Sequence, residues 1–94
     1  MMKKRRFASV WDAIEAVPSE AASMKARAEL MTAIRQTAEK WGLTQAAAAK
    51  KLGLTQPRMN DLLRGRINKF SLDALIDLAS RAGLAVRLQV RRAA

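Results

Sequence analysis

The hydrophobic positions of the chain recur mainly at spacings of three and four, which is the spacing of residues along one face of an α-helix. A long helix is predicted from about residue 20 to 41, because this stretch is rich in strong helix formers and ends at Gly42. Its inward-facing positions are Leu30, Ile34, Ala38 and Trp41, with Met24 and Met31 filling gaps in the core. A shorter helix is predicted over residues 10–16, ahead of Pro18. Its apolar face consists of Phe7, Val10, Trp11 and Ile14.

Residues 44–66 predict two short helices joined by a tight corner. Thr44 and Thr55 each have a side chain suited to cap the start of a helix, and Gly53 between them suits a left-handed backbone conformation. Apolar positions on the two helices form a common core, and these are Ala46, Ala49, Leu52, Met59, Leu62 and Leu63. The side chains left facing outward on the second helix are Gln56, Pro57, Arg58, Asn60, Asp61 and Arg64.

A further helix is predicted after Ser71, which can cap it, and this helix ends at Gly83. Its inner face is assigned to Leu72, Leu75, Ile76 and Ala79. The period then changes to two, which is typical of a half-buried strand. The apolar members of the strand are Leu84, Val86, Leu88 and Val90. A single strand lacks a ladder partner, so we expect it to pair with the same strand of a second copy, the alternative being a strand that covers its own helices or frays.

Composition narrows the classes of function. The 94 residues suit one domain with a modest core. The chain has no Cys and no His, which removes disulfides, thiolate chemistry and the usual metal ligands, so no metal site and no cofactor is expected. We find no nucleophile–base pair among its eight scattered acids, so an enzyme is the least favoured class. No apolar run approaches the ~20 residues of a membrane span, and a reducing cytoplasm is compatible with the composition.

The charge of +10 favours a polyanionic partner, although a solvated basic surface is the alternative. Between Lys50 and Lys69 the only acid is Asp61, among several Lys and Arg residues. A basic run also opens the chain, at Lys3, Lys4, Arg5 and Arg6. This run could be a solvated end or an arm that follows a DNA backbone or minor groove. The helix around Trp11 could pack on its own domain or bind a partner.

The 44–66 pattern resembles the helix-turn-helix of the Cro/CI-type (XRE) regulators, at Thr44-Gln45, Ala49, Gly53, Thr55-Gln56, Met59, Leu62 and Arg64-Gly65-Arg66. Ala47 and Pro57 depart from the pattern, because Ala47 cannot complete a capping box and Pro57 lacks an N–H. The resemblance implies an all-α, lambda-repressor-like bundle whose second helix enters the major groove. We therefore divide the chain into residues 1–18 (arm and short helix), 19–83 (helix-turn-helix domain) and 84–94 (dimerisation strand and tail).

In a complex with DNA, residues at the N-terminal end of the second helix would contact bases, and residues around that helix would contact phosphates. The base-reading candidates are Gln56, Pro57, Arg58, Asn60 and Asp61, and the phosphate-binding candidates are Thr44, Gln45, Thr55, Arg64, Arg66, Asn68 and Lys69. Gln56 suits adenine and Arg58 suits guanine. Asp61 could accept a hydrogen bond from cytosine or pair with Arg58 or Arg64. A dimer would favour an inverted repeat.

Over almost its whole length the chain is similar to HigA-type antitoxins, in VWDAIE, KARAELM, LTQAAAAKKLGLTQPRMNDLLRG and FSLDALIDLASRAGLAVRLQV. This resemblance implies a homodimeric repressor of its own operon that, in many members, neutralises an mRNA-cleaving toxin. The alternatives are a stand-alone phage-type repressor and an interaction module that masks a partner without binding DNA. RNA binding is less favoured, because the chain has no Tyr and only two Phe for stacking unpaired bases.

Overall fold

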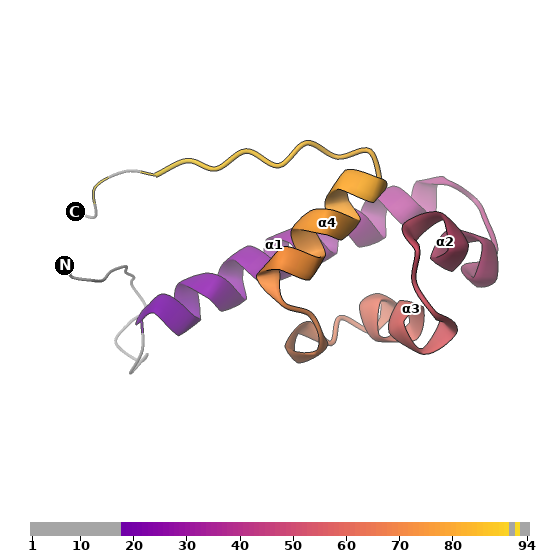
Figure 1. Cartoon of the computed structure of the whole chain (residues 1–94), viewed down its shortest axis with the longest axis horizontal. Coiled ribbons are helices and arrows are strands. Elements are labelled where there is room, and N and C mark those ends of the chain that lie inside the picture. The colour runs from indigo at the N-terminus through magenta and orange to yellow at the C-terminus, as the bar shows by residue number, and fades with distance from the viewer. Residues whose placement is uncertain (1–17, 91, 93–94) are drawn as a thin grey trace.

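The part of the chain that the structure describes forms four helices and a short 3₁₀ turn (Figure 1). The structure is a computed structural model that describes residues 18–90 and 92. The helices are α1 (Pro18–Lys40), α2 (Gln45–Leu52), α3 (Gln56–Leu63) and α4 (Leu72–Arg81), with η1 (Ile67–Lys69) between α3 and α4. The predicted arm and the helix around Trp11 lie outside the described residues.

The predicted helix starts are confirmed by their capping hydrogen bonds. Thr44 accepts a bond from the Ala47 N–H at 3.1 Å, Thr55 from the Arg58 N–H at 3.3 Å, and Ser71 from the Ala74 N–H at 3.1 Å. Each cap satisfies one of the N–H groups that the first turn of a helix leaves without an intrahelical partner. The capping residues therefore fix where α2, α3 and α4 begin.

The core lies where α1 and α4 pack together and α2 and α3 close against them. Its largest fully buried side chains are Phe70, Met31, Ile34, Leu52, Met59, Leu62 and Leu75. The predicted stripe on α1 is confirmed, with Ile34 and Ala38 buried and Leu30 and Trp41 partly buried against the core. α1 spans the length of the domain (Figure 1), and α3, η1 and α4 pack against it, whereas α2 packs against α3 and α4.

Three predicted core positions are wrong. Ala46 is exposed, because Ala48, Ala49 and Leu52 form the buried face of α2 and Ala46 lies to its side. Ile76 is 40% exposed while Leu78 is buried, because the inner face of α4 is centred on Leu75, and Ile76 is rotated by about 100° from that residue. Met24 is 42% exposed on α1 rather than a core gap-filler.

The segment after α4 has the apolar alternation of a strand but no ladder. Leu84 packs partly against the core and its N–H donates to the Ala79 carbonyl at 2.8 Å. From there the chain leaves α4 as an extended trace (Figure 1), in which Leu88 is 89% exposed and Val90 82% exposed. Residues 18–90 and 92 contain no strand, so the all-α part of the fold is confirmed, and the strand and its pairing stay a prediction.

None of the helices in the described part of the chain is long and apolar enough to cross a membrane.

Candidate nucleic-acid interface

The turn between α2 and α3 is made at Gly53, the residue that ends α2. Gly53 has φ 73°, a left-handed conformation that costs a residue with a Cβ atom about 1–2 kcal/mol. Its N–H donates to the Lys50 carbonyl, and the Leu54 N–H donates to the Ala49 carbonyl at 2.8 Å. Leu54 is then partly buried against the core, which leaves Thr55 to open α3.

The side chains of α3 differ in how far they are exposed to solvent. Gln56 and Pro57 at its start and Arg64 at its end are exposed, while Met59 and Leu62 are buried. The predicted readers Arg58, Asn60 and Asp61 are half-buried. Pro57 is compatible with the helix because residues in the first turn have no intrahelical partner for their N–H groups. The front of α3 therefore presents Gln56 and Pro57 most openly.

Arg58 lies across the loop that follows α3. Its Nη1 donates to the Lys69 carbonyl at 2.6 Å, and the centre of its guanidinium is 4.2 Å from the centroid of the Phe70 ring. Phe70 is only 2% exposed, so the ring is a fixed part of the core. A cation over an aromatic face at this separation is an attractive contact. Arg58 is thus in contact with the loop while remaining half-buried rather than enclosed.

Asp61 pairs with Arg66, which is neither of the intrahelical partners that the sequence suggested. Arg66 Nη1 lies 3.0 Å from Asp61 Oδ1, and the Asp61 side chain is only 16% exposed. The reason is the turn at Gly65, whose φ of 70° brings the chain back so that the Arg66 N–H also donates to the Asp61 carbonyl at 3.0 Å. Side chain and backbone together attach the loop to α3.

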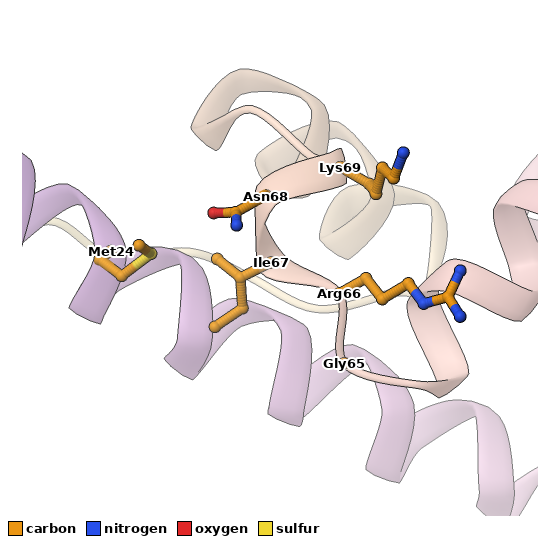
Figure 2. Close-up of a pocket in the computed structure, with 6 residues that line it drawn as sticks. All are labelled: Met24, Gly65, Arg66, Ile67, Asn68 and Lys69. Carbon is orange, nitrogen blue, oxygen red and sulfur yellow. The ribbon is translucent and has the colours of Figure 1, made fainter.

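The loop of residues 65–70 carries the other predicted phosphate ligands. Asn68 and Lys69 are exposed on and beside η1. An open depression of about 540 Å³ lies between this loop and the start of α1, lined by Met24, Gly65, Arg66, Ile67, Asn68 and Lys69. Figure 2 shows Ile67 directed toward α1, whereas Arg66 and Lys69 point away from Met24. The cationic ends are therefore on the outside of the depression.

The start of α2 contributes further exposed polar residues. Thr44 and Gln45 are exposed, and Thr44 uses its hydroxyl oxygen as an acceptor for the cap. A hydroxyl group that accepts such a bond retains its hydrogen as a donor. Thr55 is in the same state at the start of α3. Both threonines can therefore cap their helix and donate to an anion at the same time.

Sequence reasoning missed the part that α1 plays in the site. Arg27 Nη1 donates to the Phe70 carbonyl at 3.3 Å, and its Nε donates to the Ser23 carbonyl at 3.4 Å. Arg27 thus joins the end of the loop to α1. No sequence signal identifies this bond, because it joins residues 43 positions apart whose proximity depends on the packing of α1 on the loop.

Comparison with known proteins identifies the motif. A family model described as a helix-turn-helix domain matches residues 15–91. The chain belongs to this helix-turn-helix family. Among solved structures, a protein named "Putative XRE Family Transcriptional Regulator" is similar with a TM-score of 0.72 and 27% identity, over 79% of this chain and 83% of that one. A search of curated proteins gave no match.

The family assignment confirms that the chain contains a helix-turn-helix domain, and α2 and α3 are the two short helices predicted within residues 44–66. In helix-turn-helix domains the second helix of the motif is the one that enters the major groove, with its N-terminal residues toward base edges. In this chain the second helix of the α2–α3 pair is α3, whose exposed N-terminal end is capped by Thr55.

Proposed function

We propose that the protein is a transcriptional regulator that binds double-stranded DNA in a sequence-specific manner. The observation that carries the proposal is the exposed front of α3, beginning with Gln56, placed between the start of α2 and the basic loop of residues 65–70. A polar helix end with donors on both sides can contact base edges in the major groove and the phosphates that flank it. Similarity to a solved structure that is named as an XRE family transcriptional regulator supports the same proposal.

Among the readers, Gln56 is assigned to adenine through its amide and Arg58 to guanine through its guanidinium. Pro57 offers an apolar surface of the kind that contacts a thymine methyl group. Asn60 lies at the edge of the contact. Asp61 would reach a cytosine amino group only by giving up its 3.0 Å pair with Arg66, so its contribution depends on that pair opening.

Phosphate contacts are assigned to two groups of residues, one at the starts of α2 and α3 and the other at the end of α3 and in the loop that follows it. Thr44, Gln45 and Thr55 lie at helix starts, where backbone N–H groups and the helix dipole favour anions. At the end of α3 and in the following loop the donors are Arg64, Arg66, Asn68 and Lys69. These contacts position the protein on the duplex without reading its sequence. Because they are electrostatic, they account for most of the dependence of affinity on salt.

Residues 84–90 are assigned to homodimerisation. Val86, Leu88 and Val90 are exposed apolar side chains at alternate positions, and pairing with a second copy would bury them and complete the backbone ladder. A two-fold ribbon would relate two α3 helices by a two-fold axis, which suits an inverted repeat with half-sites about 34 Å apart. A dimer of this kind also doubles the number of phosphate contacts per complex.

The finer proposal is an antitoxin that represses its own operon and neutralises an mRNA-cleaving toxin. Its support is the sequence similarity to HigA-type antitoxins, which extends from VWDAIE to FSLDALIDLASRAGLAVRLQV. The test is co-expression with the product of the neighbouring reading frame. A toxic neighbour whose growth arrest is relieved by this chain, and that co-purifies with it, is expected. A stand-alone repressor would bind DNA yet relieve no neighbour's toxicity.

DNA binding is tested by selecting bound fragments from random duplexes with the full-length protein. We expect an inverted repeat to be enriched, and Gln56→Ala to lose the preference at one position in each half-site. A matched control is Gln45→Ala, which removes the same side chain from a position assigned to phosphates and should lower affinity without changing the base preference. If no sequence is enriched and the protein forms only a salt-independent complex with another protein, the chain is an interaction module and the proposal is wrong.

A further inference from the structure

We infer that Phe70 is a positioning residue for sequence reading, because its buried ring holds the guanidinium of Arg58 in the orientation from which it reads a base. The inference rests on the proposed function and deepens it. It assigns a specificity role to a residue that cannot itself touch DNA, since only 2% of its surface is exposed.

The first step is that Arg58 is held at two points. Its guanidinium carbon is 4.2 Å from the Phe70 ring centroid, and its Nη1 donates to the carbonyl of the adjacent residue, Lys69, at 2.6 Å. The attractive contact with a fixed ring restricts where the guanidinium can lie. The hydrogen bond to the loop carbonyl then restricts how the guanidinium can rotate.

The second step is that these contacts leave most N–H donors of the Arg58 guanidinium available to a base. A guanidinium has five N–H donors, and the bond to Lys69 uses one of them. Within the described residues, neither Nε nor Nη2 of Arg58 has a hydrogen-bond acceptor, and the side chain is half-buried rather than enclosed. The edge formed by these two nitrogens can donate two parallel bonds, which is the geometry that matches O6 and N7 of guanine.

The third step concerns the anchor itself. The Phe70 backbone carbonyl accepts a bond from Arg27 of α1 at 3.3 Å, and its ring lies in the core with Leu75 and Met31. The loop that orients Arg58 is therefore attached to α1 as well as to α3. A long arginine side chain that is already ordered loses less conformational entropy on binding than a mobile one. Discrimination at the base read by Arg58 should consequently depend on Phe70.

The test uses the full-length protein, its selected duplex, and a panel in which each base pair of one half-site is changed singly. For the wild type we expect a wrong base at the guanine assigned to Arg58 to weaken binding roughly 5- to 150-fold, the discrimination that a bidentate pair provides. Arg58→Ala should abolish the preference at that position. Phe70→Leu, which keeps an apolar side chain but removes the ring, should reduce the same preference at least threefold and leave the other positions unchanged.

Two further variants separate positioning from a general loss of stability. Ile34→Val removes buried volume on α1 and should leave discrimination unchanged at every position, with each variant assayed at a temperature where circular dichroism shows it folded. Arg58→Ala combined with Phe70→Leu should discriminate no worse at that position than Arg58→Ala alone, because Phe70 acts through Arg58.

The outcomes are distinguishable. If the wild type shows no sequence preference, the proposed function and this inference fail together. If the wild type is selective and Arg58→Ala removes the preference at one position but Phe70→Leu does not, the inference alone is wrong. It is also wrong if Phe70→Leu or Arg58→Ala weakens all duplexes equally, since a purely structural role would have that effect.

Discussion

The guanidinium of Arg81, in the last turn of α4, lies against the corner at Gly53. A Cβ atom built at Gly53 would be 2.7 Å from Nη1 of Arg81. Arg81 also pairs with Asp77 at 2.9 Å, and both of these side chains are more than half exposed. The corner of the helix-turn-helix thus has two constraints, a backbone conformation with φ of 73° and a neighbouring flexible cation.

Substitution of Gly53 by Ala should lower the free energy of unfolding by about 1–2 kcal/mol, because the left-handed conformation is unfavourable for a residue with a Cβ atom. The flexible end of Arg81 can move away at little cost, since exposed ion pairs contribute about 0–1 kcal/mol. Urea denaturation measures the change. Gly83→Ala is the matched control, since Gly83 has φ 84° and a Cβ there would meet nothing within 4 Å. Equal losses would identify the backbone as the cause. Recovery of most of the loss in Gly53→Ala combined with Arg81→Ala would show instead that the contact is responsible.

Thr55→Ala should destabilise the protein by about 1 kcal/mol, because it removes the acceptor for the Arg58 N–H at the start of α3. Thr55→Ser keeps a hydroxyl at the same position and should retain most of the stability. The urea midpoint of the two variants provides the measurement. If alanine and serine were equivalent, the 3.3 Å cap would contribute nothing measurable and another interaction would have to fix the start of α3.

DNA affinity should fall steeply with salt, by roughly 10³-fold or more between 50 and 200 mM, if each copy of a dimer neutralises about three to five phosphates. Lys69→Ala should weaken binding to all duplexes alike and, because each copy of the dimer loses one phosphate contact, reduce the slope of log K against log salt by about 2. Fluorescence anisotropy at several salt concentrations checks both. Lys25→Ala is the control, because it removes the same charge from an exposed position on α1. A Lys69→Ala protein with an unchanged slope would remove this lysine from the phosphate contacts.

The features that could be predicted from the sequence are those that depend on neighbouring residues. Thr44, Thr55 and Ser71 cap their own helices, so the starts of α2, α3 and α4 follow from local chemistry alone. The inner face of α4 is harder to predict, because Leu75, Ile76, Leu78 and Ala79 are all apolar and only the position of α1 decides which of them are buried. Periodicity has no means of making that choice.

The contacts of the candidate site could be predicted even less. Helical spacing predicts that Arg58 projects outward from α3, but its guanidinium lies over the ring of Phe70, twelve positions later in the chain. The same spacing offers Asp61 a partner within its own helix, but Gly65 turns the chain and supplies Arg66 instead. Both contacts depend on the path of the loop after α3, and neither charge pattern nor helix spacing encodes that path.

Leu88→Asp should convert a dimer into a monomer and weaken binding to an inverted repeat more than binding to a single half-site. The reason is that Leu88, which is 89% exposed, is assigned to the apolar face of the paired strands, where a charge would be buried at high cost. Gln89→Asp adds the same charge at the adjacent position, which faces the opposite side in a strand, so it should leave the dimer intact. Sedimentation equilibrium measures the mass, and anisotropy on full and half sites measures the binding. A Leu88→Asp protein that still sediments as a dimer would show that residues 84–90 do not form the interface, and the second α3 would then have to be placed by another surface.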